Sequence, residues 1–152
     1  VVEASRDSLQ QWLSWPEYID SEESARSFLS AAKREASETG GCTFGIWCSG
    51  KLAGSIVLHG IDGQNRSTSL SYWLGNSFRG NGVMVRSLTA VLNHCFTGLD
   101  INRVEAAVEN TPSTRVPERL GFTLEGVLRQ RERIAGRYHD CGIYSMLRGE
   151  WR

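Results

Sequence analysis

The chain changes its hydrophobic period at Gly75. Before that glycine, the segments 43–48, 52–58 and 67–74 show the residue types and alternation of β-strands, separated by short turns. After it, apolar residues recur at helical spacing from Met84 to Phe96. Because short turns join antiparallel strands and a long helix can serve as a parallel crossover, the change predicts antiparallel hairpins followed by one parallel pairing in a single sheet.

The rest of the chain extends this pattern to a mixed α/β order. Residues 1–13 are predicted to be helical at least in part, and Asp20 or Ser21 is expected to cap a helix that ends before Gly40. The further expected elements are a strand at 103–108, a helix at 113–120 and strands at 122–133 and 138–147. With 152 residues and no linker of low complexity, the chain is expected to form a single domain over 1–152.

Charge and cysteine usage narrow the functional classes. The 17 basic and 17 acidic side chains cancel, which argues against a nucleic-acid partner or a membrane surface, since both attract an excess of Lys and Arg. No apolar stretch reaches the roughly 18–20 residues of a membrane span, and charged residues stand where a signal peptide would be apolar. The four cysteines form no CxxC pair and the three histidines no ligand cluster. We therefore expect a cytoplasmic protein with reduced thiols and no metal.

A glycine-rich loop from Leu74 to Met84 lies between a predicted strand and an amphipathic helix. Glycines there let the backbone approach a ligand, and the amides and dipole at a helix N-terminus favour an anion such as a pyrophosphate. An ordinary strand–helix turn would have the same pattern. A dinucleotide fold would require a third glycine where Val85 stands and parallel units before the loop, and a P-loop would require Gly-Lys-Ser/Thr. Both of these nucleotide folds are therefore excluded.

The same loop carries a resemblance to a known family. Its residues Arg79-Gly80-Asn81-Gly82-Val83-Met84 resemble the acetyl-coenzyme A pyrophosphate loop of GNAT N-acetyltransferases, in the Gly-x-Gly-Val/Ile-Met form of the RimJ/RimL branch. Further motifs resemble that branch in order: Tyr72-Trp73-Leu74-Gly75, Asn102-Arg103-Val104-Glu105, Glu109-Asn110-Thr111-Pro112-Ser113, residues 117–126, and Tyr138-His139-Asp140 with Tyr144. The resemblance covers residues 12–152.

This resemblance implies the GNAT fold, an α/β fold with a mixed, mostly antiparallel central sheet flanked by helices. Members of the branch normally begin with a strand that precedes the first helix. The usual first edge strand is therefore expected to be absent from this chain, as in an N-terminally truncated domain.

The resemblance also implies acetyl-CoA as the co-substrate and assigns residues to it. The strand at 71–74 would separate from the following parallel strand to admit the pantetheine arm, which would pair with backbone groups of Trp73 and Leu74. The residues expected to hold the pyrophosphate are Arg79, Gly80, Asn81, Gly82, Val83, Met84 and Val85. Asn110 would contact the coenzyme and Ser113 would lie beside its sulfur, although the residue types alone favour helix capping.

Two residues are implied to act in catalysis. Ser113 would protonate the departing thiolate, a task that Tyr144 or Tyr138 would take instead if this enzyme resembled the many GNAT members that use a tyrosine. Glu132 would face the acceptor amine and accept its proton through a water. Taken alone, Glu132 fits an exposed strand of alternating charges equally well. No covalent enzyme intermediate is required, so direct transfer is expected.

The acceptor is expected to be a primary amine, either the N-terminal amine of a protein such as a ribosomal one or a small amine-bearing metabolite or antibiotic. The resemblance puts Trp15, Tyr18 and Phe28 beside the acceptor cleft, where they would stack on a flat group. Packing in the core explains these aromatic residues equally well. The alternative function is a non-catalytic acetyl-CoA-binding module, and the expected state is a monomer or homodimer.

Overall fold

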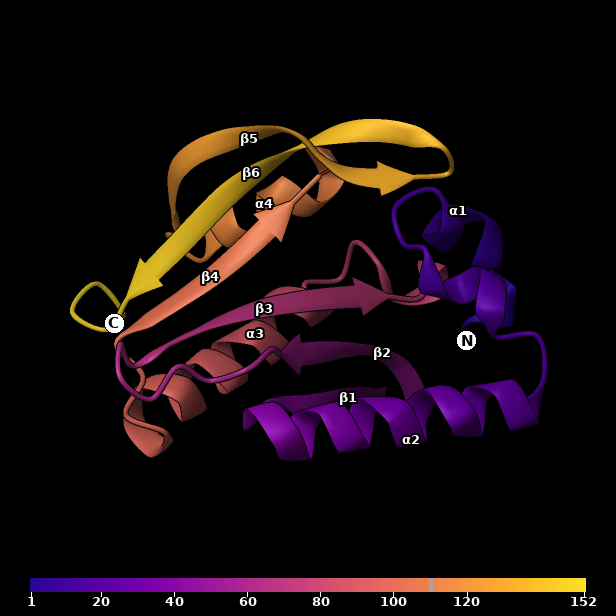
Figure 1. The fold of residues 1–152 in the computed structure, drawn as a ribbon, viewed down its shortest axis with the longest axis horizontal. Coiled ribbons are helices and arrows are strands. Elements are labelled where there is room, and N and C mark those ends of the chain that lie inside the picture. Colours follow the sequence, from indigo (N-terminus) through magenta and orange to yellow (C-terminus); the bar gives the residue numbers. More distant parts are fainter. Residues whose placement is uncertain (110) are drawn as a thin grey trace.

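A six-stranded sheet forms the centre of the molecule (Figure 1). The computed structural model describes residues 1–109 and 111–152. The strands are β1 (Cys42–Cys48), β2 (Lys51–Leu58), β3 (Ser67–Leu74), β4 (Arg103–Val108), β5 (Thr123–Ile134) and β6 (Arg137–Leu147). They lie in the order β1-β2-β3-β4-β6-β5; β3 and β4 pair in parallel, and the other described neighbours pair antiparallel. The predicted mixed, mostly antiparallel α/β sheet is confirmed.

The helical elements follow the predicted order. They are η1 (Glu3–Ser5), α1 (Arg6–Gln10), η2 (Trp15–Tyr18), α2 (Glu22–Thr39), η3 (Asn76–Phe78), α3 (Val83–Asn93), η4 (His94–Gly98) and α4 (Thr111–Arg119). Ser21 caps α2 as expected, because its hydroxyl accepts a hydrogen bond from the Ser24 N–H while the Ser24 hydroxyl accepts one from the Ser21 N–H. Gly40 ends this helix in the left-handed conformation, with φ of 72°.

The two long helices contribute very differently to the core. Helix α3 lies behind the sheet (Figure 1), where Leu88 and Leu92 are buried against sheet residues such as Val104 and Met146. Helix α2 runs beside β1, and none of its residues, all of which the structure describes, is buried. Leu29 on this helix remains 61% exposed. The buried core of the protein therefore lies between the sheet and α3, and this core fixes the position of the strand ends.

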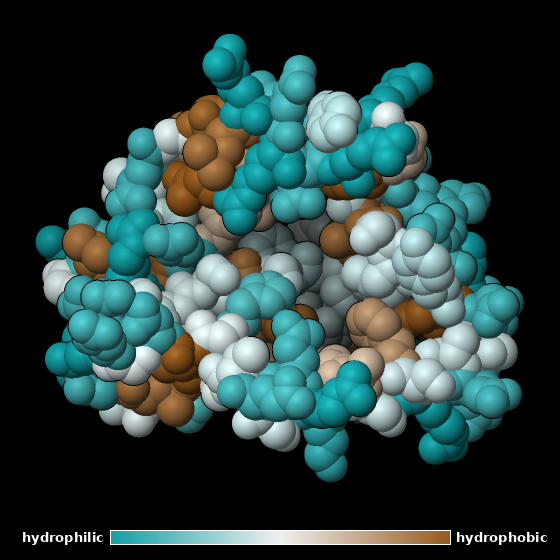
Figure 2. Space-filling view, in the orientation of Figure 1, coloured by the Kyte–Doolittle hydropathy of each residue, from teal (hydrophilic) through white to brown (hydrophobic). Residues whose placement is uncertain are grey.

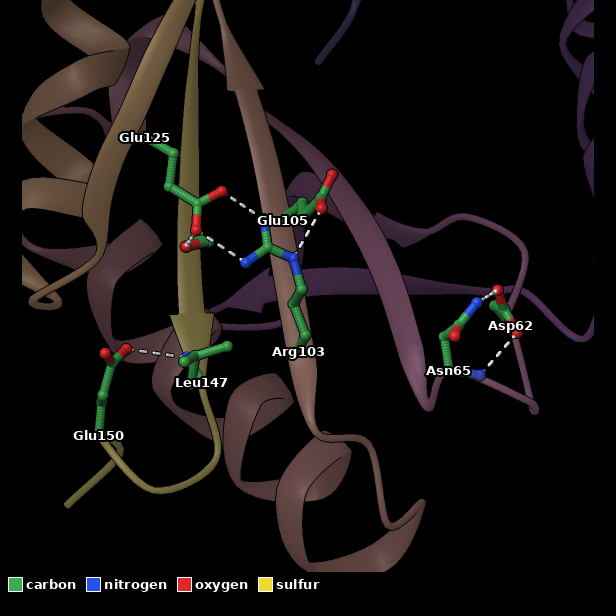
Figure 3. Close-up of polar contacts among 8 residues, drawn as sticks. Asp62, Asn65, Arg103, Glu105, Glu125, Leu147 and Glu150 are labelled. Atoms are coloured by element: carbon green, nitrogen blue, oxygen red, sulfur yellow. Dashed lines mark hydrogen bonds and ion pairs between the residues drawn. The ribbon is translucent and has the colours of Figure 1, made fainter.

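A charged network braces the start of β4 (Figure 3). The Arg103 guanidinium donates to Glu105 of the same strand, with 2.8 Å from Nε to Oε1, and forms a two-nitrogen ion pair with Glu125 of β5. The Ser145 hydroxyl of β6 donates to the same Glu125 carboxylate at 2.8 Å. Three strands are thus joined by charge-assisted hydrogen bonds at this end of the sheet.

Two further expectations concerned the state of the cysteines and membrane-spanning segments. Each of the four cysteines, all within the described residues, is a free thiol. Among the described residues, no helix is long and apolar enough to cross a membrane.

Candidate active site

The parallel strands β3 and β4 separate before they end. Their pairing runs from Ser67 opposite Arg103 to Leu70 opposite Ala106, whereas β3 continues to Leu74 and β4 to Val108. We call the ends of the two strands that no longer pair with each other, residues 71–74 and 107–108, the splay. Figure 2 shows that the surface is hollowed over this region of the sheet. The separation predicted for the strand at 71–74 is therefore present.

Backbone groups of β3 face into the splay in alternation. The Ser69 carbonyl and the Gly75 N–H bond to β2, at 2.9 Å from His59 N and 2.8 Å to Ala53 O. Because successive residues of a strand direct their N–H and C=O groups to opposite sides, those of Tyr72 and Leu74 point toward β4. The backbone groups of Trp73 point toward β2, where this residue is paired with Ser55. Tyr72 and Leu74 are therefore the residues whose main chain lines the splay.

The glycine loop leads directly from the splay into α3. Gly80 and Gly82 have φ of 82° and 68°, a left-handed conformation that other residue types rarely adopt. Gly82 is the N-cap of α3 and, within this fully described segment, no side chain caps the helix. The first N–H groups of the helix, at residues 83–85, are thus available to an anion, and the exposed Arg86 adds positive charge where its Nη1 donates to the Asn81 carbonyl at 3.0 Å.

Arg79 joins this loop to the strand end. Its Nε donates to the Leu74 carbonyl at 3.1 Å, and its own carbonyl accepts from the Asn81 side chain at 3.4 Å. The side chain predicted to help hold a pyrophosphate therefore also fixes how the loop leaves β3.

Helix α4 begins on the far side of the splay. The Tyr72 hydroxyl donates to the Ser113 backbone carbonyl at 3.0 Å, which ties β3 to the first turns of α4. Burial raises the pKa of Tyr72 well above its usual value, so this residue remains a neutral phenol. Ser113 is half-buried beside it. Asn110, also predicted to contact the coenzyme, lies outside the described residues.

Three titratable groups meet next to Tyr72. The carboxylates of Glu109 and Glu132 and the Cys141 thiol have ligand atoms that all lie within 4.8 Å of one another. Cys141 is fully buried, and its Sγ donates to Glu109 Oε1 at 3.7 Å. Burial, followed by the charges of the two glutamates, raises the pKa of this thiol to about 11. Burial also raises the pKa of Glu109, and the Glu132 charge adds to that shift.

The residues around Ser113 and Glu132 include two, Tyr72 and Glu109, to which the sequence assigned no role. Tyr72 contacts Ser113 on one side, and Glu109 acts electrostatically on Tyr72 and lies beside Glu132 on the other. Their positions in the sequence could have indicated a role. Glu109 directly follows the predicted parallel strand at 103–108, and Tyr72 lies in the strand that separates from it.

The two tyrosines considered as alternative acids occupy contrasting places. Tyr144 is buried, and its hydroxyl donates to Glu118 of α4 at 3.3 Å. Burial and the Glu118 carboxylate raise the pKa of Tyr144. Tyr138, near the β5–β6 turn, is 63% exposed.

Aromatic side chains from the N-terminal helices gather at the other side of the splay. The Trp15 ring stacks on Phe28 with centroids 5.3 Å apart, and it also contacts Trp73 of β3 at 5.4 Å. Trp12 meets His139 of β6 edge-on at 5.7 Å, consistent with the place of α1 beside the β5–β6 turn (Figure 1). Of the three residues predicted to bind the acceptor, Trp15 and Phe28 are brought together, whereas Tyr18 lies apart from these ring contacts and is 68% exposed.

The parallel strands β3 and β4 separate, and a glycine loop leads from β3 into helix α3. This arrangement defines a class of fold, and a comparison of the sequence with family models identifies the same class. The profile of the Acetyltransferase (GNAT) domain matches residues 2–123. This chain belongs to the GNAT acetyltransferase family.

Relatives narrow this assignment to one branch. The chain is 33% identical over 150 residues to the putative ribosomal N-acetyltransferase YdaF of Bacillus subtilis, covering 97% of this chain and 82% of the relative. It is 30% identical over 141 residues to the ribosomal-protein-serine acetyltransferase of Escherichia coli, covering 91% and 79%.

Solved structures agree with these relatives. RimL, the ribosomal L7/L12 α-N-protein acetyltransferase in complex with coenzyme A, superposes with a TM-score of 0.89 at 33% identity, over 96% of this chain and 84% of that one. The microcin C7 self-immunity acetyltransferase MccE, in complex with acetyl-CoA and AMP, gives 0.88 at 26% identity, over 96% and 82%.

The protein is therefore a RimJ/RimL-like N-acetyltransferase that depends on acetyl-CoA and transfers the acetyl group to an amine. The residues present fit this co-substrate, because the splay offers β3 backbone groups that are not paired with β4 and the loop offers uncapped amides at the start of α3. Enzymes of this family require no metal for the transfer.

Proposed function

We propose that this enzyme acetylates the N-terminal α-amine of a protein, with ribosomal proteins as the substrate class. The observation that carries the proposal is the similarity, along 97% of the chain, to a protein named as a putative ribosomal N-acetyltransferase. The likeness to RimL along 96% of the chain supports the same substrate class. Because an α-amine has a pKa near 8, against about 10.4 for a lysine side chain, its deprotonation asks little of a base.

The co-substrate would bind along the splay and the glycine loop. When bound, acetyl-CoA supplies a thioester whose acetyl group passes to the amine. The amides of the loop from Gly80 to Val85 would hold the pyrophosphate, with Arg79 fixing the loop, and Asn110 and Ser113 would contact the coenzyme from the α4 side. Trp73 and Leu74 would meet the pantetheine arm. The alternation along β3 supports Leu74 as the backbone partner and Trp73 as a side-chain wall.

Glu132 and Ser113 would carry the proton transfers. Glu132 is part of the carboxylate cluster, and its side chain is 46% exposed, so a water can connect it to the amine. Ser113, beside Tyr72, would protonate the leaving sulfur. Holding the amine against the thioester supplies the larger share of the rate, up to roughly 7–11 kcal/mol for well-oriented reactants.

A small amine that carries a flat group is the second candidate acceptor. The Trp15 ring contacts both Phe28 and Trp73, the latter on the strand that borders the splay, and a similar structure, that of MccE, contains AMP together with acetyl-CoA. In the conformation seen here Trp15 already has ring partners at 5.3 and 5.4 Å. A flat acceptor would therefore have to displace one of these partners.

An acceptor screen with acetyl-CoA distinguishes these candidates. Peptides with N-terminal Ser or Ala, aminoacyl nucleotides, spermidine and aminoglycosides would be compared by mass detection and thiol release. The proposal expects the peptides to give the highest kcat/KM. Turnover of aminoacyl nucleotides but not of peptides would overturn it in favour of the second candidate, and Trp15→Ala should then raise the KM for that acceptor.

Two further features of the protein remain predictions. A cytoplasmic location is supported by bacterial relatives that are named for ribosomal-protein substrates. The state in solution is expected to be a monomer or homodimer, which light scattering of the purified protein measures directly.

A further inference from the structure

Two carboxyl groups meet beside the splay, and the proposed function uses only one of them. We infer that Glu109 is a positioning residue for acetyl transfer, which forms with Glu132 a coupled carboxylate pair that receives the proton of the acceptor amine. The inference rests on the proposed function, in which Glu132 is the base. It adds a second carboxylate that lies close enough to share the proton with that base.

An irregularity in β5 brings Glu132 to this place. Leu128 is opposite Cys141 and Glu132 is opposite His139, so the three residues 129–131 face the single residue Asp140. In a regular ladder Gln130 would stand opposite His139. Gln130 instead has φ of 53°, and its N–H donates to the Asp140 carboxylate at 2.8 Å. Bulges of this kind re-aim side chains next to active sites, and here the extra residues place Glu132 on the cluster that contains Cys141.

Glu109 reaches the same point from β4. Val108 is paired with Gly142, so Glu109 follows at the end of the strand beside Cys141, whose thiol donates to it at 3.7 Å. A thiol is a weak donor, and Glu109 is half-buried. A backbone hydrogen bond and the thiol both favour the ionised form, but burial outweighs them, so the pKa of Glu109 is raised overall.

The groups that face the pair provide little positive charge. They are Arg131 from β5, Cys141 and His139 from β6, and Tyr72 from β3. Raised pKa values keep Cys141 and Tyr72 uncharged at neutral pH. Arg131 is 41% exposed, and its Nε lies 4.0 Å from Glu132 Oε1, the outer limit of an ion pair. Such an exposed and distant pair contributes little.

Two carboxylates this close do not ionise independently. The first proton to bind relieves their repulsion, so the pair takes it up at a higher pH than a single exposed carboxyl would. A base with a raised pKa is better matched to an amine at neutral pH. In the transfer, the amine nitrogen forms the amide bond as the carbon–sulfur bond breaks, the amine proton passes to the pair through Glu132, and the leaving sulfur takes up a proton from the acid.

The pH profile of kcat/KM tests the pairing. Glu109→Gln keeps the shape and the acceptor atom for Cys141 but removes the neighbouring charge. The acidic limb of the profile should therefore move to lower pH, by about half to one pH unit for a partly exposed partner. Glu109→Asp, which keeps the charge, should restore most of the wild-type limb. Glu105→Gln is the matched control, because it removes a carboxylate from the same face of β4, and it should leave the limb where it is.

Carboxyl titration by ¹³C NMR in the absence of substrates separates this inference from the proposed function. In the folded wild-type protein, the Glu109 carboxyl should titrate above the ordinary pKa of about 4.3, and in Glu132→Gln, which removes the neighbouring charge, its pKa should move down. This result would support the pair even if the screened amines were not acetylated. If Glu109 titrates identically in wild type and Glu132→Gln, with both proteins folded by circular dichroism, the two carboxylates are uncoupled and the inference is wrong.

Discussion

The two ends of β4 place carboxylates of the same sheet in opposite electrostatic surroundings. At the start of the strand, Arg103 is held between Glu105 and Glu125, and this pairing lowers the pKa of Glu125 to about 2 (Figure 3). At its end, Glu109 meets a second carboxylate, Glu132, and a buried thiol, and its pKa is raised. Glu109 thus lies six positions after Arg103 and four after Glu105, yet its surroundings are repulsive where theirs are neutralised.

This difference indicates that the carboxylates at the start of β4 contribute to stability, whereas those at its end are suited to catalysis. A carboxylate that is paired and fully hydrogen-bonded contributes to folding and has little tendency to exchange protons. A carboxylate near a like charge is destabilised in its ionised form, so it holds its proton more readily. Repulsive placements of this kind are typical of sites that move protons. The start of β4 therefore acts as a structural anchor, and its end provides the candidate catalytic groups.

Removal of the Glu132 carboxylate should have the largest effect on activity. Glu132→Gln is expected to lower kcat by about 100-fold, the lower range of general base contributions, while the affinity for acetyl-CoA stays near the wild-type value. Steady-state kinetics and calorimetry with coenzyme A measure the two quantities. A variant with wild-type kcat would remove Glu132 from the mechanism.

Ser113→Ala should have a smaller effect, of about tenfold on kcat. A thiol has a pKa near 8.5, so the sulfur leaves readily even with little help from an acid. Coenzyme binding is expected to change little. Full activity in Ser113→Ala would assign the proton donor elsewhere, and Tyr144→Phe is then the first variant to compare.

Loss of the anchor should reduce stability and not chemistry. Glu125→Gln is expected to lower the urea midpoint at pH 7, with kcat close to that of wild type once the protein is folded. The folded pKa of Glu125 is depressed to about 2, whereas an unfolded glutamate titrates near 4.3. The stabilisation by the ionised group is therefore complete above about pH 4.3 and is lost as the pH falls toward 2. Urea midpoints measured between pH 7 and pH 2.5 should show this slope in wild type and a shallower one in the variant.

Much of the fold was predictable because it depends on local period and turn chemistry. Alternation gave β3 to within its observed bounds, the helical stripe from Met84 gave α3, and Gly40 marked the end of α2. The loop with Gly80 and Gly82 was predictable for the same reason, since its backbone conformation requires glycine.

The carboxylate pair was not predictable, because it depends on register. The distance between Glu109 and Glu132 is fixed by the extra residues around Gln130, which no alternation pattern in the sequence indicates. The contact of Trp15 with Trp73 likewise depends on where η2 packs against β3. Such placements follow from tertiary structure, and the sequence provides only the residue types.

The smallest predicted effect also distinguishes the two ends of β4 most clearly, because the signs are opposite. A carboxyl with a raised folded pKa binds its proton more tightly in the folded state, so its contribution lowers stability as the pH rises above its unfolded value. Glu109→Gln should therefore raise the urea midpoint slightly at pH 7–8, whereas Glu125→Gln lowers it. Below about pH 4, where Glu109 is protonated in both states, wild type and Glu109→Gln should converge. If Glu109→Gln instead lowers the midpoint at pH 7, Glu109 is stabilised there by contacts of the kind made by Glu125, and the contrast between the two ends of the strand fails.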